Sequence, residues 1–243
     1  MARCRFCGEK AEIFLRYARM PLCKKCFPKY YTRKVSKALE KMKIASNDKI
    51  LVALSGGKDS AALLHSLSSL RKVSAIHIML GVENYSKKML EACESLCKDL
   101  DVKLIVYDIK KELGFSASDF VKFSKSACSV CGTIKRYLLN KIAWENSFDY
   151  VATGHNADDL SSHILSNFID GNISLLARIE FFSAKNEKLK LVGRIKPLYR
   201  TLEFENELYC KILSLPYVSD SCPLGKGAPQ KEIKKLLNLL EKR

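Results

Sequence analysis

The stretch Ser55-Gly56-Gly57-Lys58-Asp59-Ser60 follows the apolar residues 50–53, which end at Ala53, and precedes a second apolar segment that begins at Ala61. The first segment is typical of a buried parallel strand, and the second of an amphipathic helix that starts at the polar residues. Gly56 and Gly57 can adopt positive φ and bring backbone amides close to an anion, which a helix N-terminus also favours, and the two serines add hydroxyl donors. The sequence therefore predicts a phosphate-binding loop.

Two alternatives to this interpretation are a Walker A loop and an ordinary tight turn. A Walker A loop needs a glycine five residues before its Gly-Lys pair and a serine or threonine directly after the lysine. Val52 and Asp59 occupy those two positions, so the motif fails at both. The strand and helix patterns on either side favour a phosphate loop over a tight turn.

Length and composition indicate a globular protein. A chain of 243 residues has room for one sizeable α/β domain and a small appendage. No stretch approaches the ~20 apolar residues of a membrane span, and the N-terminus lacks the apolar core of a secretion signal. We therefore expect a cytoplasmic protein.

The charge balance is strongly basic, with 42 basic and 26 acidic residues and a formal net charge of +16. Such a surface attracts phosphate polyanions, so nucleic acid is the leading partner, with a generally lysine-rich solvated surface as the alternative. The chain also has ten cysteines. Without a secretion signal they indicate metal ligation or redox chemistry rather than a disulfide framework.

Two Cys-x-x-Cys knuckles stand near the N-terminus, separated by fifteen residues: Cys4 with Cys7, and Cys23 with Cys26. This spacing is typical of a closed, structural four-thiolate zinc site, which we assign to residues 1–30. Reduced thiols or a redox pair are the alternatives. Arginines and lysines surround the ligands, which suits a module that also contacts a nucleic-acid backbone.

The rest of the chain predicts a doubly wound parallel sheet. A basic connecting helix is expected over residues 31–47, beginning near Tyr30. Within residues 48–215, strand-like and helical segments then alternate. The strand-like segments are 49–54, 73–80, 102–107 and 150–153. The helical segments are the one that follows the phosphate loop and ends near residue 70, and those at 87–100, 132–146 and 158–169. This alternation places helices on both faces of a parallel sheet, with ligands at the carboxyl ends of the strands. A loop and a basic amphipathic closing helix follow over residues 216–243.

Two further segments are expected near the phosphate loop. Thr153-Gly154-His155-Asn156-Ala157-Asp158-Asp159 again lies between a strand and a helix. Gly154 allows close approach to a ligand, and Asp158 and Asp159 could hold magnesium or orient a nucleotide. An ordinary helix cap is the alternative, because Asn and Asp stabilise any first turn.

The second segment carries Cys128 and Cys131, and a third cysteine, Cys222, stands in a loop near the C-terminus. Three thiolates would leave one iron of a 4Fe-4S cluster open to an exogenous group such as sulfide. A three-cysteine zinc site and a catalytic disulfide with a persulfide are the alternatives. The cysteines at 93, 97 and 210 stand among apolar residues and are expected to be buried.

These motifs together resemble the tRNA 2-thiouridine synthetases of the TtuA and cytosolic thiouridylase type, a branch of the PP-loop ATP pyrophosphatases. The resemblance runs through nearly the whole chain. It rests on the two knuckles, residues 55–60, Cys128-Ser-Val-Cys131-Gly-Thr-Ile-Lys135, Thr153-Gly-His-Asn-Ala-Asp-Asp159, Lys196-Pro-Leu-Tyr-Arg200 and Ser221-Cys-Pro-Leu-Gly225.

The resemblance implies a HUP-like domain that splits ATP between its α and β phosphates. The phosphates of ATP would bind at residues 55–60, where Lys58, Asp59 and magnesium would contact them. The adenosine would bind near Met79. Lys135 and Gly154 match positions that contact the nucleotide in the family. O2 of a tRNA uridine would be adenylated and replaced by sulfur. The family pattern makes Cys128, Cys131 and Cys222 ligands of a 4Fe-4S cluster and the four N-terminal cysteines ligands of zinc. It also implies a ubiquitin-like sulfur carrier and a homodimer.

The sequence departs from the family in one clear respect. Family members commonly carry a second C-terminal zinc finger, whereas this sequence ends at Arg243 without those knuckles, which leaves the RNA target open. Two other functions stay open from the residues alone. One is an adenylating enzyme that acts on tRNA cytidine or a small-molecule carbonyl, and the other is a non-catalytic RNA-binding subunit.

Overall fold

The computed structural model describes residues 2–121, 127–220, 222–225 and 229–241. Ser221 of the C-terminal cysteine motif and the side chain of Cys128 lie outside this described part. None of the described helices combines the length and the apolar character needed to cross a bilayer.

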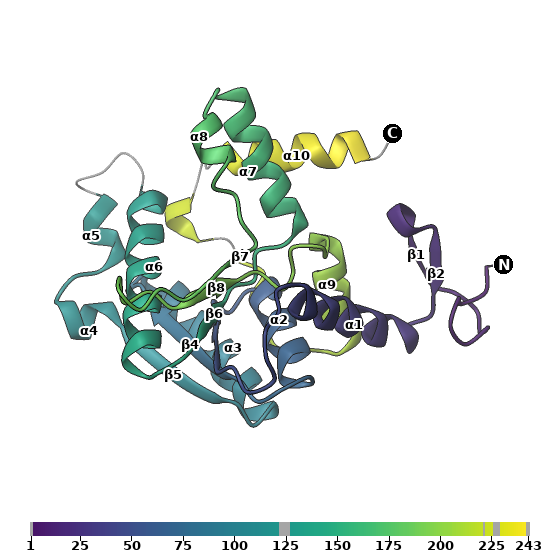
Figure 1. Ribbon diagram of the computed structural model, residues 1–243, viewed down its shortest axis with the longest axis horizontal. Coiled ribbons are helices and arrows are strands. Elements are labelled where there is room, and N and C mark those ends of the chain that lie inside the picture. The colour runs from purple at the N-terminus through teal and green to yellow at the C-terminus, as the bar shows by residue number, and fades with distance from the viewer. Residues whose placement is uncertain (1, 122–126, 221, 226–228, 242–243) are drawn as a thin grey trace.

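A six-stranded sheet forms the centre of the molecule, in the order β5-β4-β3-β6-β8-β7 (Figure 1). Its strands are β3 (Ile50–Ala53), β4 (Ser74–Met79), β5 (Lys103–Asp108), β6 (Tyr150–Ala152), β7 (Phe182–Ser183) and β8 (Gly193–Ile195). Neighbouring strands are parallel except β7, which pairs antiparallel with β8 at one edge. The predicted doubly wound parallel sheet is therefore confirmed, with one antiparallel edge strand in addition.

Each face of the sheet has its own apolar core, because side chains alternate along a strand. Ile50 and Val52 of β3 pack with α2 (Lys58–Ser68), α3 (Glu83–Asp99), α1 (Cys26–Lys41) and α9 (Glu203–Ile212). Leu51 faces the other way, toward α4 (Ile109–Leu113) and α6 (Ala127–Glu145). All three β3 side chains are at most 1% exposed, as expected of a strand covered on both sides.

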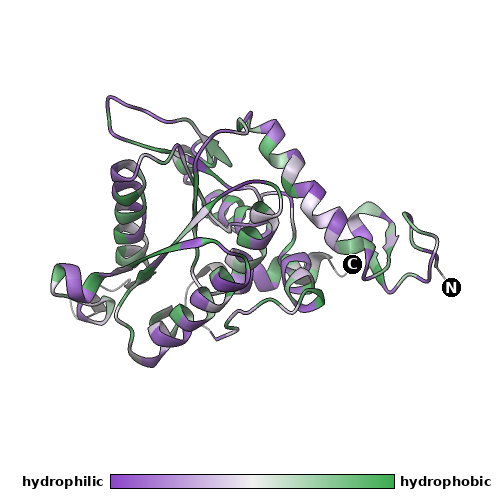
Figure 2. Ribbon diagram, turned by 90° about the horizontal axis from the view of Figure 1, so that it is seen from below, coloured by the Kyte–Doolittle hydropathy of each residue, from purple (hydrophilic) through white to green (hydrophobic). Residues whose placement is uncertain are grey.

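The N-terminal module lies at one end of the molecule (Figures 1 and 2). It consists of a short hairpin, β1 (Ile13–Leu15) and β2 (Met20–Leu22), joined by the 3-10 turn η1 (Arg16–Ala18). Helix α1 starts at Cys26, inside the second knuckle, and not near Tyr30 as expected, because Pro28 is tolerated in a first helical turn. It ends at Lys41, before the predicted boundary at residue 47.

The remaining helices lie beyond the carboxyl ends of the strands. They are α5 (Ala117–Val121), α7 (Ala157–Ile169), α8 (Ile173–Leu176), the 3-10 turn η2 (Pro223–Gly225) and α10 (Pro229–Glu241). Helix α10 packs against α7, and η2 contacts α6. Hydrophilic and hydrophobic residues alternate along the helices in Figure 2, as expected of amphipathic helices that cover a core.

Candidate active site

The phosphate loop lies where β3 ends and α2 begins, next to the switch point at which the strand order reverses. β3 pairs with β4 on one side and with β6, a hundred residues later, on the other. Crevices at such points bind ligands in open α/β sheets. Here a cavity of about 520 Å³ opens beside the loop.

Gly56 shapes the loop. It has a φ of +88°, and a Cβ at this position would lie 2.8 Å from the backbone oxygen and the sulfur of Met89. Only glycine fits both the backbone angle and the space. Ser60 closes the loop from the helix side, since its hydroxyl donates to the carbonyl of Gly57 at 2.9 Å and accepts from the amide of Ser55 at 3.1 Å. These contacts agree with the predicted cradle for an anion.

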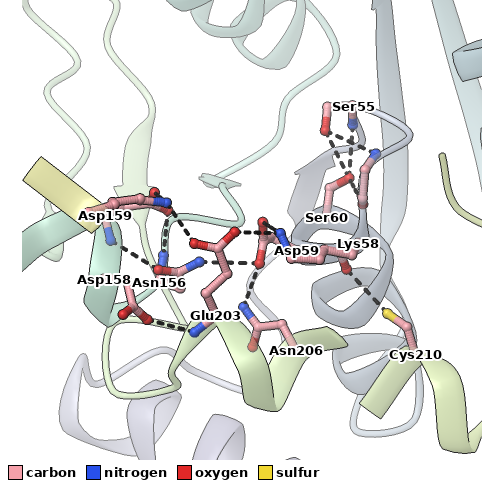
Figure 3. Close-up of polar contacts among 12 residues, drawn as sticks. Ser55, Lys58, Asp59, Ser60, Asn156, Asp158, Asp159, Glu203, Asn206 and Cys210 are labelled. Carbon is pink, nitrogen blue, oxygen red and sulfur yellow. Dashed lines mark hydrogen bonds and ion pairs between the residues drawn. The ribbon is translucent and has the colours of Figure 1, made fainter. Parts of the chain in front are cut away.

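Lys58 and Asp59 form the charged part of the loop (Figure 3). Lys58 Nζ lies 2.7 Å from a carboxylate oxygen of Glu203 and 3.4 Å from Asp59 Oδ2. Burial lowers the pKa of Lys58, but the two carboxylates outweigh it and hold the pKa above its usual value. The ammonium is therefore charged and stands at the cavity wall, where it can meet phosphate oxygens.

Glu203 connects this lysine to a second one, Lys234 of α10, at 3.0 Å. Burial raises the pKa of Glu203, but Lys58 and Lys234 together hold it below its ordinary value of 4.5. The sequence prediction did not include Glu203 or Lys234. Neither belongs to a local motif, and both reach the loop only through the fold.

The predicted aspartates of the second segment are engaged with protein groups. Asp158 accepts a hydrogen bond from the backbone amide of Glu203 at 2.6 Å. Asp159 accepts from the backbone amide of Asn156 at 3.0 Å and pairs with Lys234 at 2.6 Å. Asp159 therefore caps α7, and Asp158 binds the first amide of α9. Magnesium binding by these two residues stays a prediction.

Gly154 lies directly against the phosphate loop. A Cβ here would approach the backbone carbon of Asp59 and the amide nitrogen of Ser60 to 3.0 Å. The glycine therefore allows the loop after β6 to pack on the first turn of α2. Its predicted contact with nucleotide is a separate expectation that stays open.

The far side of the cavity brings together the other predicted groups. Lys135 of α6 and Cys222 line it, and Ile78 and Leu80, on either side of Met79, line the wall beside β4. Cys131 stands one turn before Lys135 on the same face of α6, since residues four apart are neighbours on a helix. Cys128 lies in the first turn of this helix. The contact of η2 with α6 brings the Cys222 segment to the helix that carries the other two cysteines.

The four N-terminal cysteines form a metal-binding geometry. Their sulfur atoms all lie within 4.8 Å of one another, as tetrahedral zinc coordination requires. Burial raises the pKa of Cys4, but hydrogen bonds from the backbone amides of Cys7, Phe6 and Cys23 outweigh it and lower the pKa to about 6. The pKa values of Cys7 and Cys26 are raised instead, that of Cys26 to about 12 by burial and the neighbouring thiols. The fit to zinc therefore rests on the four converging sulfur atoms.

The other cysteines are packing residues, as predicted. Cys93, Cys97 and Cys210 are at most 4% exposed. Burial raises the pKa of Cys93 to about 12, that of Cys97 to about 11 and that of Cys210 to about 12. Thiols with these pKa values are poor nucleophiles at neutral pH.

Comparison with known protein families identifies both parts of the chain. Residues 29–227 match the PP-loop domain family, and residues 3–28 match the N-terminal LIM domain of the 2-thiouridine synthetase TtuA. The chain belongs to the PP-loop domain family. The predicted family and the predicted fold are thereby confirmed.

Several relatives match nearly the whole length of this PP-loop protein. A tRNA-5-methyluridine(54) 2-sulfurtransferase of Pyrococcus horikoshii is 38% identical, over 99% of this chain and 77% of the relative. One from Thermus thermophilus is 35% identical, over 98% and 75%. The solved U34-tRNA thiolase NcsA from Methanococcus maripaludis, which contains a [4Fe-4S] cluster, has a TM-score of 0.89 at 30% identity and covers 100% of this chain and 82% of its own.

More distant PP-loop-like structures share the fold alone. An NMN synthetase from Francisella tularensis superimposes with a TM-score of 0.55 at 16% identity, over 87% of this chain and 86% of that one. The superposition on NcsA, by contrast, covers the whole chain, the N-terminal module included.

Proposed function

We propose that this protein is an ATP-dependent tRNA 2-thiolation enzyme, which adenylates O2 of a uridine and replaces that oxygen with sulfur. The observation that carries the proposal is one cavity whose wall contains the loop residues Lys58 and Asp59 on one side and Lys135 and Cys222 on the other. An adenylating loop supplies a leaving group, and Cys222 at the same cavity, with Cys131 one helical turn before Lys135, would supply a place for sulfur. The sulfurtransferase and thiolase names of the relatives support the same reaction.

The loop residues suit the first half-reaction. O2 of the uridine attacks the α-phosphorus of ATP, and pyrophosphate leaves with the electrons of the broken P–O bond. We expect the phosphates to be bound by backbone amides at Gly56 and Gly57, by the N-terminus of α2 and by Lys58, whose raised pKa supports a charged ammonium. Magnesium, held by Asp59, would offset phosphate charge when bound.

The cysteines suit the second half-reaction, in which a sulfur nucleophile attacks C2 and the C2–O2 bond breaks to release AMP. Cys222 lines the cavity, and the η2 segment beside it contacts α6, the helix that carries Cys128 and Cys131, which supports a cluster that these three cysteines would hold. Such a cluster would supply sulfide bound to an iron that has no protein ligand. This chain would contribute three thiolates to the cluster, and Lys135 lines the same cavity as Cys222.

The N-terminal module suits contact with tRNA. Arg5, Arg16 and Arg19 are exposed on it, and the whole chain carries a net charge of +16. Arginines of this kind position a nucleic acid through its phosphates.

We further propose that a ubiquitin-like carrier donates the sulfur, which a pull-down would test. We propose a homodimer, which light scattering would test, and a cytoplasmic location, which imaging of a tagged chain would test.

Nucleoside mass spectrometry of tRNA from a deletion strain tests the function. We expect one thiolated uridine to disappear and to return with the wild-type gene but not with Asp59→Asn. Unchanged levels of every thiolated nucleoside would overturn the proposal. AMP formation without uridine-containing tRNA would instead favour a cytidine or small-molecule acceptor.

The same tRNA identifies the modified position. Relatives at 38% and 35% identity are named for position 54, and NcsA, at 30%, for position 34. We therefore propose position 54. Mass spectrometry of nuclease fragments should find the lost sulfur in the T-loop fragment, and a loss in the anticodon fragment would contradict this assignment.

A further inference from the structure

Asp59 of the phosphate loop is held by two asparagines from distant parts of the chain. Asn206 of α9 donates from Nδ2 to Asp59 Oδ1 at 2.8 Å, and Asn156, the N-cap of α7, donates from Nδ2 to the same oxygen at 3.2 Å (Figure 3). Both asparagines are completely buried. One carboxylate oxygen thus receives two amide donors, and among the described residues Oδ2 has Lys58 Nζ as its contact, at 3.4 Å.

Both amides are locked in this orientation. The Oδ1 of Asn206 accepts a 2.6 Å hydrogen bond from the hydroxyl of Tyr31, which is itself buried. The Oδ1 of Asn156 accepts from the backbone amide of Asp159 at 3.0 Å. Since each amide oxygen is occupied by a donor, each NH₂ group must face Asp59.

The two asparagines fix the carboxylate without neutralising it. A lysine or arginine at either position would cancel the charge of Asp59, whereas an amide leaves it negative. The side chain of Asp59 keeps 29% of its surface exposed and lines the cavity. Because the two amides occupy Oδ1 of Asp59, Oδ2 is the oxygen that remains available to bind a cation.

We propose that Asn206 and Asn156 are positioning residues that hold Asp59 so that Oδ2 faces the phosphates of ATP and their magnesium. This inference rests on the proposed use of ATP. It assigns a role in the reaction to α9, a helix that carries no recognisable motif. The role needs no contact between either asparagine and the nucleotide.

The test uses Asn206→Asp, which changes one NH₂ group to an oxygen and keeps the acceptor for Tyr31. We expect the affinity for ATP in the presence of Mg²⁺, measured by calorimetry, to fall about 10- to 100-fold, as is typical when a partner of a metal-binding carboxylate is lost. Affinity for ATP in EDTA should change much less. Equal losses with and without Mg²⁺, or no loss, would overturn the proposal.

Asn206→Leu and a control variant separate positioning from folding. Asn140→Leu removes an amide that bonds the carbonyl of Lys190 at 2.9 Å and the amide of Val192 at 3.0 Å, away from the loop. We expect both leucine variants to lose stability and only Asn206→Leu to lose Mg²⁺-dependent binding. The same binding loss in both would show a purely structural role.

A double-mutant cycle with Asp59→Asn completes the test. If Asn206 acts through Asp59, adding Asn206→Asp to Asp59→Asn should cause no further loss of Mg²⁺-dependent binding. An additive loss would overturn the proposal. Because every readout is ATP binding, a wild-type protein that binds Mg²⁺-ATP but makes no thiolated tRNA would refute the proposed function and leave this inference standing.

Discussion

Gly56 is the residue on which the shape of the phosphate loop depends. Its φ of +88° is a conformation that costs an L-residue about 1–2 kcal/mol, and the neighbouring Met89 leaves no space for a methyl group. Backbone angle and steric fit therefore act together at one position. They can be separated by experiment.

We expect Gly56→Ala to destabilise the fold by more than the cost of the backbone angle and to abolish tight ATP binding. The control is Gly114→Ala, where φ is +77° and nothing lies within 4 Å of the added Cβ. Urea denaturation of both variants should show a loss of about 1–2 kcal/mol for Gly114→Ala and a larger one for Gly56→Ala. Equal losses would mean that Met89 moves aside freely.

Glu203 gives the protein a predictable response to acid. Its pKa is held below 4.5 in the folded state, so its ion pairs contribute stability above that pH and lose it as the pH falls through the folded pKa. We expect the unfolding free energy of the wild type to fall more steeply than that of Glu203→Gln below about pH 4.5. Urea titrations from pH 3 to 7 measure both slopes, and parallel curves would contradict the assignment.

Helix α9 shows what an element can contribute without a motif. Glu205, completely buried, accepts hydrogen bonds from Lys34 of α1 at 2.8 Å and from Tyr17 of the N-terminal module at 3.0 Å. The next residue, Asn206, contacts Asp59. One face of α9 thus fastens the module to the main domain, and the neighbouring position supports the phosphate loop.

Lys34→Met should be strongly destabilising, because it leaves the buried carboxylate of Glu205 without its cation. Removing one partner of a buried pair costs about 3–5 kcal/mol. The matched control is Lys235→Met, whose pair with Glu232 is 70% and 73% exposed and worth about 0–1 kcal/mol. Thermal or urea unfolding of the two variants compares them directly, and a loss below 1 kcal/mol for Lys34→Met would contradict a buried ion pair.

The sequence predicted most elements because their patterns are local. The strands at 50–53, 74–79 and 103–108 and the helices at 58–68 and 83–99 lie within a few residues of their expected positions, whereas the short helices α4 and α5 after β5 were not predicted. Strands β7 (Phe-Ser) and β8 (Gly-Arg-Ile) were not predicted, since neither has the apolar run that marks the equally short β6, Tyr-Val-Ala. Glu203, Asn206 and Lys234 were missed for a different reason, because their roles arise from contacts between elements that are far apart in sequence.

At the scale of the whole molecule, the two cysteine groups should hold different metals. We expect anaerobically prepared protein to contain about four iron atoms and one zinc per chain. Cys131→Ser should lower the iron content and leave zinc unchanged, and Cys7→Ser should do the reverse. Elemental analysis of the three proteins measures this, and iron that is absent from the wild type even after reconstitution would refute the cluster assignment.

The pairing of β3 with β6 also determines when the site can form. Ile50 pairs with Tyr150, so the central parallel pair closes a segment of a hundred residues. At synthesis rates of about 5–20 residues per second, β6 leaves the ribosome some 5–20 s after β3. During that interval β3 has one unpaired edge, and an unpaired edge of an apolar strand can pair with other chains, so aggregation of the nascent chain competes with folding until residue 150 arrives.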